Sequence, residues 1–322
     1  MTPRAWQLLR LLSDGNFHSG DVLGQQLGIS RATVFSALSK VTEFGVQLQR
    51  IRGRGYRLVP AWQQLDLELV KAALAADAAR FQLEILQQAT SSNTELLRRA
   101  TQGAASGSVL AVELQTGGRG RIGRVWHTGL GNALTFSLLW RFNCGLNALS
   151  GLSLAVGVAI MRALHRFEVT GAGLKWPNDI LSSDGKLGGV LIEAQGDMYG
   201  PSCVVIGIGL NCSLPQSLAQ LINQRASSID QLCTQPLDRN LLLAALLQEL
   251  ACVLEQFSSS GFAGFQEEWQ RYHLQQNCPV RLTMPDGSLV SGTALGVSVS
   301  GELRLATADG VRLFNSGEVG TC

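Results

Sequence analysis

The most informative segment of this sequence is a glycine- and arginine-rich loop near the middle of the chain, Gln115-Thr116-Gly117-Gly118-Arg119-Gly120-Arg121-Ile122-Gly123-Arg124-Val125-Trp126. Three of its glycines satisfy the G-x-G-x-x-G pattern of dinucleotide-binding folds. In those folds the glycine loop opens a helix, and an acidic residue that binds the ribose follows roughly 20 residues later. Here no helical pattern follows, and the position of the acid is held by Trp140 and Arg141. The sequence therefore argues against a Rossmann domain.

The composition of this loop is typical of a mobile flap over an anionic ligand. Its glycines make the backbone flexible, and the guanidinium groups of Arg119, Arg121 and Arg124 can bind phosphate or carboxylate oxygens. Such a flap suits a nucleotide or a reactive phosphoanhydride that has to be kept from water. The alternative, a solvated basic loop, fits less well because Gln115 and Trp126 flank the arginines.

A polar segment lies between two predicted strands, one over residues 81–86 and the other over residues 108–114. In this stretch Ser92 and Glu95 have the spacing of a helix-capping box. The alternative is that the hydroxyl and amide groups at this strand-to-helix junction hold a polar ligand.

Two motifs further along the chain combine charged residues with strands. Lys175-Trp176-Pro177-Asn178-Asp179 places a cation, an amide and a carboxylate around a proline-fixed turn. Lys186 enters an apolar strand beside two glycines, which would let a ligand approach the backbone closely. A buried strand predicted over 204–210 ends at Asn211, a suitable place for a polar ligand contact.

The first 60 residues predict a basic winged helix-turn-helix. They carry a formal charge of +5, from eight Lys/Arg and three Asp/Glu, so the other 262 residues sum to −3. Amphipathic helices are expected over 4–12, 20–27 and 31–44, followed by a basic hairpin. Recognition helices read bases with their N-terminal residues, and hairpin tips reach phosphates. The candidate DNA contacts are therefore Ser30, Arg31, Thr33, Arg52 and Arg54. The alternative is a three-helix protein-interaction domain.

Length and composition predict a globular, multidomain protein. With 322 residues, 46% of them hydrophobic, the chain has room for two or three domains and is too apolar to be disordered. One long uncharged stretch, residues 142–161, contains several Asn, Ser and Gly residues, which favours a buried core helix over a membrane span. The seven cysteines form no Cys-x-x-Cys pair, so we expect free thiols in a cytoplasmic protein and no protein-bound metal site.

The C-terminal part predicts two helices, over 237–257 and 262–272, and then a small β domain. From Pro279 onward, four or five short strands alternate with turns such as Pro285-Asp286-Gly287. Strands of this length and spacing are typical of a small barrel.

Taken in order, these motifs closely resemble those of biotin–protein ligases. The resemblance covers essentially the whole chain and is carried by Gly-Arg-Gly-Arg-x-Gly-Arg-x-Trp, Lys-Trp-Pro-Asn-Asp, Lys-Leu-Gly-Gly-Val-Leu-Ile-Glu and Gly-Leu-Asn. The N-terminal module makes the chain similar to the bifunctional bacterial form, which is also the biotin operon repressor. The resemblance implies an α+β multidomain fold. Its parts would be a winged helix-turn-helix (1–60), a class II synthetase-like α/β domain with a mixed sheet (65–273), and an SH3-like β-barrel (277–322).

The resemblance also implies the reaction and the partners. Biotin and ATP, with Mg²⁺ on the nucleotide, would give biotinyl-5′-AMP and pyrophosphate. A lysine of the biotin carboxyl carrier domain of acetyl-CoA carboxylase would then attack the activated carbonyl. With the adenylate bound, a homodimer would repress biotin-synthesis genes at operator DNA, in the cytoplasm and without a membrane.

Residue roles follow from the same resemblance. The Lys186 ammonium would stabilise charge as the acyl phosphate forms, and Arg121 would stabilise phosphate charge, so both are candidate catalytic residues. The implied biotin contacts are Ser91, Ser92, Asn93, Gln115, Arg119, Gly120, Arg121 and Lys186. The implied nucleotide contacts are Arg124, Trp126, Lys175, Asn178, Asp179 and Asn211. Asp179 would be at most a partial Mg²⁺ ligand. The turn Ser316-Gly317-Glu318-Val319 matches the family's closing turn, in a domain that borders the active site.

One position departs from the family pattern. Repressor-type members have a tryptophan that covers the adenine, whereas residues 212–229 contain no aromatic residue and Ala226 occupies that position. Weaker stacking would loosen the adenylate and its coupling to repression. Two alternatives stay open: a lipoate–protein ligase, against which the arginine loop argues, and a biotin-sensing repressor without ligase activity, against which Lys186 and Arg121 argue.

Overall fold

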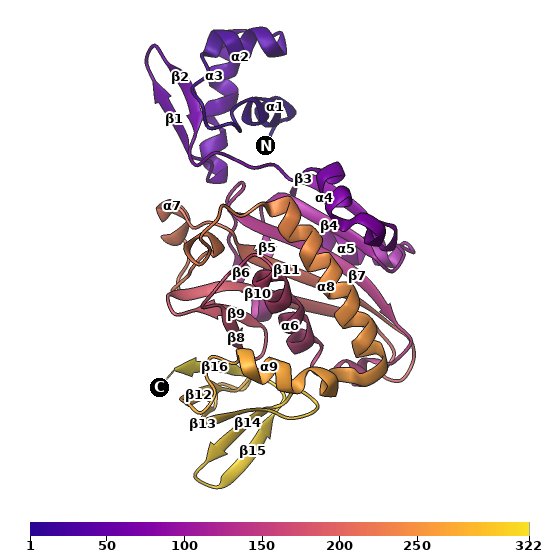
Figure 1. The fold of residues 1–322 in the computed structure, drawn as a ribbon. Helices are drawn as coiled ribbons and strands as arrows, with labels where there is room; N and C mark the ends of the chain where they lie inside the picture. The colour runs from indigo at the N-terminus through magenta and orange to yellow at the C-terminus, as the bar shows by residue number, and fades with distance from the viewer. Residues whose placement is uncertain (322) are drawn as a thin grey trace.

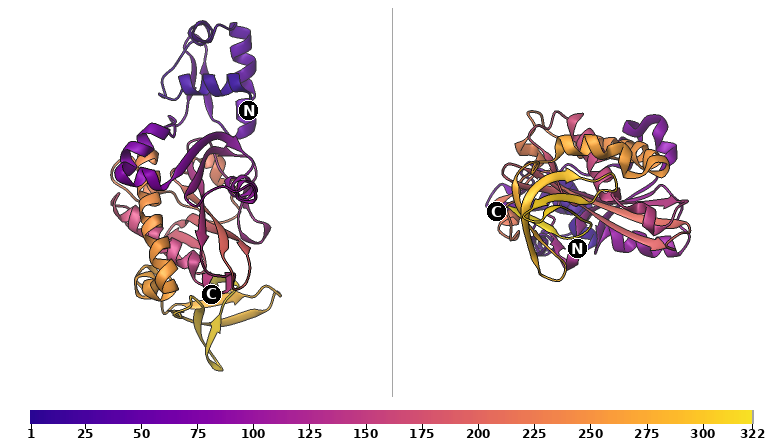
Figure 2. Two further views of the ribbon diagram at one scale, coloured as in Figure 1. Left: turned by 90° about the vertical axis from the view of Figure 1, so that its right-hand side faces the viewer. Right: turned by 90° about the horizontal axis from the view of Figure 1, so that it is seen from below.

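The computed structural model describes residues 1–321 and arranges them in three parts (Figure 1). A small head at the N-terminus is joined by an extended linker to a large α/β body, and a β sheet at the C-terminus packs on the opposite end of the body (Figure 2). Cys322, the last residue of the predicted 277–322 domain, lies outside the described residues.

The head has the predicted order of helices, turn and hairpin. Its elements are α1 (Pro3–Leu11), α2 (Gly20–Leu27), α3 (Arg31–Ser39), the 3₁₀ turn η1 (Val41–Phe44), β1 (Leu48–Ile51) and β2 (Gly55–Leu58). Each α-helix begins at a hydroxyl residue that accepts a backbone N–H bond: Thr2, Ser19 and Ser30. The prediction that the third helix continues to residue 44 is wrong. It ends at Ser39, and the tighter turn that follows brings Val41 into the core, fully buried.

The body is built on a mixed sheet, as predicted, and this sheet has seven strands. Its strands are β3 (Gln82–Ala89), β4 (Ser108–Gln115), β7 (Ala133–Phe142), β8 (Gly173–Lys175), β9 (Asp179–Ser182), β10 (Gly185–Gly196) and β11 (Ser202–Asn211). The order is β3-β4-β7-β11-β10-β9-β8, and only β3 and β4 are parallel neighbours. Parallel neighbours need a crossover. The chain between them forms α5 (Ser92–Thr101), which begins shortly after the end of β3.

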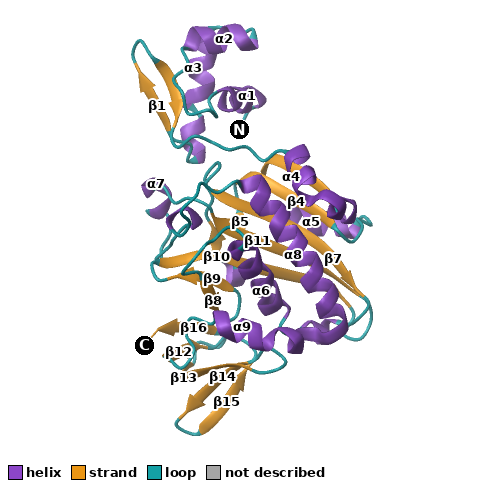
Figure 3. Ribbon diagram, in the orientation of Figure 1, coloured by secondary structure: helices purple, strands orange, loops and turns teal. Residues whose placement is uncertain are grey.

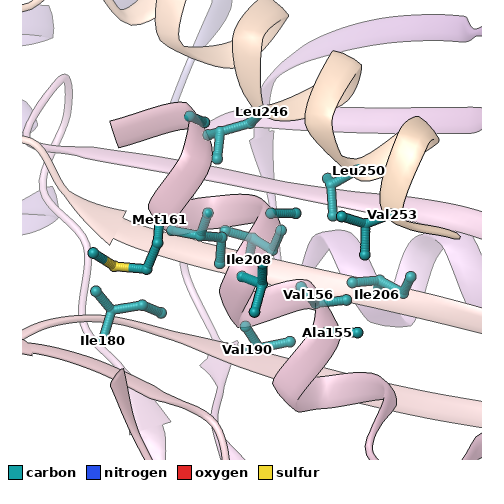
Figure 4. Close-up of a cluster of buried hydrophobic side chains, with 14 of the residues drawn as sticks. Ala155, Val156, Met161, Ile180, Val190, Ile206, Ile208, Leu246, Leu250 and Val253 are labelled. Atoms are coloured by element: carbon teal, nitrogen blue, oxygen red, sulfur yellow. The ribbon is translucent and has the colours of Figure 1, made fainter. Parts of the chain in front are cut away.

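Helices cover both faces of this sheet (Figure 3). The helices of the body are α4 (Leu67–Leu74), α5 (Ser92–Thr101), α6 (Leu152–His165), α8 (Arg239–Ser260) and α9 (Gln266–Tyr272), and the short α7 (Gln216–Ala219) lies in the loop region beside the sheet. Successive side chains of β11 point to opposite faces of the sheet. Ile206 and Ile208 join the large core formed with α6 and α8 (Figure 4), whereas Val205 packs with Leu96 of α5.

Arg239–Tyr272, which contains α8 and α9, is the only stretch within residues 1–321 that is long and apolar enough to cross a membrane. Of its most apolar window, 61% is buried inside the protein, and α8 packs against α4 and α6 as a core helix. The helix predicted within residues 142–161 is present only in part. It begins at Leu152, after Gly151 ends the preceding loop with a φ of 77°.

The C-terminal sheet has five antiparallel strands, in agreement with the predicted SH3-like part. They are β12 (Pro279–Thr283), β13 (Leu289–Val297), β14 (Leu303–Thr307), β15 (Gly310–Phe314) and β16 (Glu318–Thr321), in the order β15-β14-β13-β12-β16. The pairing of β12 with β16 places Thr283 opposite Glu318, and both residues border the body.

A tryptophan in the linker joins the head to the body. The Trp62 ring lies 5.8 Å from that of Trp6 in α1, and it shares a buried cluster with Leu130 of the body. A Cβ at Gly131 would lie 2.6 Å from the Trp62 ring, so the glycine leaves the space that this ring occupies. The Trp62 indole donates to Glu113 of β4 at 3.4 Å.

Candidate active site

A cavity of about 350 Å³ opens between the glycine-arginine loop, the first turn of α5, strands β8 to β11 and the C-terminal sheet. All of the predicted ligand contacts except Asn211 line this cavity: Ser91, Ser92, Asn93, Gln115, Arg119, Gly120, Arg121, Arg124, Trp126, Lys175, Asn178, Asp179 and Lys186. Motifs that lie up to 95 residues apart in the sequence are therefore brought to one place.

One wall is the junction between β3 and α5. Ser91 is the N-cap of α5, because its hydroxyl accepts a backbone N–H of the first turn at 3.4 Å. The predicted capping box of Ser92 and Glu95 is therefore wrong. Glu95 instead binds Arg98 and Arg99 on the same helix, and their hydrogen bonds lower its pKa to about 2. Ser92 does not cap the helix and instead lines the wall of the cavity.

A hydrogen-bond network runs along this wall. Gln115 Oε1 accepts the backbone N–H of Ser92 at 2.7 Å. The Ser137 hydroxyl lies 2.7 Å from Ser92 Oγ and 2.5 Å from Asn93 Oδ1. The Asn93 amide donates to a β10 carbonyl at 3.2 Å and to Glu193 at 3.0 Å. Because Ser92, Asn93 and Ser137 are buried, the wall holds fixed, uncharged hydrogen-bonding groups.

Glycines form the floor of the cavity. A Cβ at Gly207 would lie 2.1 Å from Asn93 Oδ1, and a Cβ at Gly209 would lie 2.6 Å from the Trp126 ring. The missing side chains on this face of β11 let Asn93 and Trp126 pack directly against the strand, and both glycines line the cavity beside them. Neither glycine was predicted as a lining residue, although alternate glycines in an apolar strand are a signal of close approach.

Lys186 and Asp179 form an ion pair inside the cavity. Lys186 Nζ lies 2.6 Å from Asp179 Oδ1, and their side chains are only 16% and 19% exposed. The register of β10 against β9 shifts between Lys186 and Gly188, and a bulge of this kind redirects a side chain. The candidate catalytic lysine thus has a carboxylate counter-ion at contact distance.

Two more cations in the cavity are desolvated. Burial lowers the pKa of Lys175, and the nearby Lys186 lowers it further, while Asp179 opposes the shift. Burial also lowers the pKa of Arg121, again against the attraction of Asp179. Arg121 Nη1 donates to Asn178 Oδ1 at 3.0 Å. These cations gain stabilisation when an anionic group enters, so this end of the cavity favours phosphate or carboxylate.

Ion pairs hold the glycine-arginine loop at both ends. Arg119 Nη2 lies 2.6 Å from Glu193 Oε2 on β10, and Arg124 is ion-paired with Glu318 on β16. At its apex Ile122 has a φ of 54°, which is costly for a β-branched residue, and its side chain points to solvent. The arginines were predicted from the sequence, whereas the two glutamates that bind them, Glu193 and Glu318, had no predicted role.

Asn211 lies behind the cavity and does not line it. Its side chain is 3% exposed, and its amide donates to the carbonyls of Lys186 at 3.2 Å and Ser227 at 3.0 Å. It therefore braces the following segment instead of facing a ligand. Within that segment Ala226 pairs with Lys186 as a β-bridge, and Gln224 lines the cavity.

The C-terminal sheet closes one side of the cavity with residues that had no predicted ligand contact: Thr283, Glu318, Val319 and Gly320. The sequence signal for these residues was the resemblance of the Ser316–Val319 turn to a closing turn of the family. That resemblance assigned no role to any single residue of the turn.

The candidate DNA contacts lie on the surface of the head. Ser30 and Arg31 are exposed at the start of α3, Thr33 is half-buried, and Arg52 and Arg54 are exposed between β1 and β2. Arg31 is paired with an aspartate at 3.5 Å, but both side chains are more than 70% exposed. An ion pair so exposed contributes little, so Arg31 is available to a phosphate or a base.

Comparisons with known proteins agree with this geometry. Residues 4–57 match a helix-turn-helix domain family, 85–211 the biotin/lipoate A/B protein ligase family, and 277–319 the biotin protein ligase C-terminal domain. The biotin protein ligase from Aquifex aeolicus in complex with biotin and ATP has a similar structure, with a TM-score of 0.62 and 27% identity over 74% of this chain and 97% of that chain.

Two curated relatives match nearly end to end. The bifunctional ligase/repressor BirA of Salmonella typhimurium is 32% identical over 312 residues, and that of Escherichia coli is 32% identical over 313 residues. Each match covers 97% of this chain and 95% of the relative. The chain therefore belongs to the BirA family of bifunctional ligase/repressors.

Proposed function

We propose that the chain attaches biotin to a carrier protein in two steps within the cavity. First, a carboxylate oxygen of biotin attacks the α-phosphorus of ATP, giving biotinyl-5′-AMP and releasing pyrophosphate. Then a lysine amine of the biotin carboxyl carrier domain of acetyl-CoA carboxylase attacks the acyl carbon. AMP leaves with the electron pair of the acyl–oxygen bond, the amine loses a proton, and an amide remains.

The division of the cavity into an uncharged end and a cationic end carries this proposal. The wall of Ser92, Asn93 and Gln115 offers neutral hydrogen-bonding groups, which suit the ureido ring of biotin. The opposite end holds Lys175, Arg121 and Lys186, which suit a carboxylate and phosphates. A ligand with a neutral polar ring at one end and a carboxylate at the other fits this division.

Lys186 belongs to the cationic end of the cavity, where it contacts Asp179. Its ammonium would neutralise the biotin carboxylate on approach to the phosphate and would stabilise the charge that develops during both steps. Asp179, at 2.6 Å, is the counter-ion of this lysine and fixes the position of its ammonium group. The loop arginines, Arg119 and Arg124 among them, would cover the adenylate and exclude water.

The residues of the cavity fit a Mg²⁺ ion only as a companion of the nucleotide. Mg²⁺ takes one or two carboxylates together with phosphate and water oxygens. Asp179 lines the cavity at its cationic end, and its carboxylate is already paired with Lys186. Asp179 would therefore hold the ion in part, and the phosphates would hold the rest.

The head supports a role as a repressor at operator DNA. Its exposed groups at the start of α3 and between β1 and β2 would contact bases and phosphates. A two-fold homodimer would place two such helices on a palindromic site, with biotinyl-5′-AMP as the effector. The six cysteines within residues 1–321 are free thiols, which supports a cytoplasmic location.

The cavity also bears on the two alternatives. A lipoate–protein ligase would bind a dithiolane ring, which offers no hydrogen-bonding partner to Ser92, Asn93 and Gln115. A repressor without ligase activity would not need Lys186 and Arg121 beside the same pocket.

Transfer of biotin to an isolated carrier domain tests the enzymatic proposal. The purified chain with biotin, ATP and Mg²⁺ should label one carrier lysine, detected by mass spectrometry. Lys186→Ala should slow adenylate formation about 100-fold, since one lost oxyanion donor costs roughly 3 kcal/mol. Lys71→Ala, on the exposed surface of α4, serves as the control. An unlabelled carrier would favour a ligase-inactive repressor, and an unchanged rate in Lys186→Ala would reject the role of that lysine.

Operator binding tests the second activity. Fluorescence anisotropy of operator-like DNA should rise with the full chain, and more strongly when biotin and ATP are present. Binding that ignores biotin and ATP would contradict the proposed control of repression by the adenylate.

A further inference from the structure

Glu193 joins two parts of the site that are far apart in the sequence. Its Oε2 atom accepts a hydrogen bond from Arg119 Nη2 at 2.6 Å and one from Asn93 Nδ2 at 3.0 Å. Arg119 stands at the start of the glycine-arginine loop, whereas Asn93 belongs to the buried wall of the cavity. One carboxylate oxygen thus connects the loop to the wall.

We propose that Glu193 is a positioning residue for ligation, which latches the loop onto the biotin end of the cavity. The inference rests on the proposed function and adds to it a residue that touches neither substrate. Glu193 lies on β10 two residues beyond Leu191, which lines the cavity, while Glu193 itself does not. It acts through the two side chains that it binds.

The negative charge is needed because the loop concentrates positive charge. Arg119, Arg121 and Arg124 lie within six residues and repel one another when the loop is closed. The Arg119–Glu193 pair offsets this repulsion at the biotin end. Since the two side chains are 42% and 26% exposed, loss of the pair should have little effect on global stability but should free the loop.

The second contact of Glu193 fixes the orientation of the Asn93 amide. Both Nδ2 hydrogens of Asn93 have acceptors, one of them Glu193, and Oδ1 faces the Ser137 hydroxyl at 2.5 Å. Ser137 in turn contacts Ser92 Oγ at 2.7 Å. Without the carboxylate, a donor of the 2%-exposed Asn93 loses its partner, and the polar wall that would receive biotin loses its fixed geometry.

The opposite end of the loop offers a contrast. Arg124 is bound there by Glu318 on the C-terminal sheet, beside the cationic end of the cavity. If each glutamate holds its own end, Glu193 variants should weaken biotin binding, and Glu318→Gln should mainly weaken ATP binding. A general loosening of the fold would weaken both in either variant.

Direct binding to the full chain tests the latch. Isothermal titration with biotin should give a dissociation constant about tenfold higher for Glu193→Ala, and a smaller rise for Glu193→Gln, which keeps an acceptor. Trypsin should cleave after the loop arginines faster in both variants. Glu95→Gln is the matched control: it breaks ion pairs with Arg98 and Arg99 on the same helix as Asn93, and it should leave biotin affinity and loop cleavage unchanged.

Three outcomes would overturn the inference. Wild-type biotin affinity or wild-type loop cleavage in Glu193→Ala would show that no latch exists. Equal losses of biotin and ATP affinity, with a fall in Tm beyond that of Glu95→Gln, would show a structural role instead. If the wild-type chain itself binds no biotin, the proposed function fails together with the latch, which distinguishes that result from the first two.

Discussion

Replacement of Arg239 by alanine tests the buried ion pair beside the linker. Arg239 Nη2 lies 3.0 Å from Glu113 Oε2, and both side chains are 4% exposed. The same guanidinium donates to the backbone carbonyls of Gln63 at 2.7 Å and Ala133 at 3.0 Å. The other oxygen of Glu113 accepts the Leu65 N–H at 2.5 Å. One ion pair therefore joins the linker, β4, β7 and the start of α8.

The expected magnitude follows from the burial of both partners. Removal of one partner leaves an uncompensated charge in the interior, which costs about 3–5 kcal/mol. In a domain of roughly 200 residues, 1 kcal/mol shifts Tm by about 2–4 °C, so Arg239→Ala should lower Tm by roughly 6–20 °C. Because Glu113 also holds Trp62 and Leu65, the linker should become more sensitive to proteases.

Differential scanning calorimetry of the full chain measures this effect. Arg166→Ala is the control, since Arg166 is 49% exposed and lies 3.6 Å from Glu249, a pair that should contribute at most about 1 kcal/mol. The double variant Glu113→Gln/Arg239→Met removes both charges, keeps an acceptor for Leu65 and Trp62, and should recover part of the lost stability. A fall in Tm for Arg239→Ala that is no larger than the fall for Arg166→Ala would refute the reasoning.

Three further predictions concern the cavity. Arg121→Gly removes the bond to Asn178 and a phosphate-binding cation, so biotinyl-5′-AMP should escape faster in a filter-retention assay; full retention would count against the flap. Gly207→Ala places a Cβ 2.1 Å from Asn93 Oδ1 and should reduce biotin affinity about 100-fold by calorimetry; near-wild-type affinity would contradict the assigned wall. Burial lowers the pKa of Lys175 below its usual value of 10.5, so the folded state binds fewer protons than the unfolded state between the two pKa values. Across that window stability should rise with pH, while ATP binding weakens as Lys175 loses its charge. Lys175→Arg should abolish this weakening. If the KM for ATP depends on pH in the same way in Lys175→Arg and in the wild-type chain, Lys175 does not bind ATP through its charge.

Residues inside contiguous motifs could be predicted from the sequence. Lys175 and Asp179 flank one proline turn, and Arg119 to Arg124 share one loop. Once the resemblance assigns such a motif to the site, every residue of the motif is assigned with it. The mixed sheet follows in a similar way from strand and helix signals, together with the fold that the resemblance implies.

Local competition and long-range packing explain what the sequence analysis missed. Ser91 and Ser92 are adjacent hydroxyl residues, and only the backbone geometry at the end of β3 decides that Ser91 is the cap. Asn211 ends its strand as predicted, but the path of the next segment turns its amide away from the cavity. Glu193 and Glu318 act on arginines 74 and 194 residues away, and sequence patterns carry no signal for such pairs.

The central claim is that biotin is activated by ATP beside Lys186. Exchange of labelled pyrophosphate into ATP by the purified chain measures this step without a carrier protein. The account predicts exchange that depends on biotin, is not supported by lipoate, and falls about 100-fold in Lys186→Ala. Exchange supported by lipoate but not by biotin, or no exchange with either acid, would contradict it.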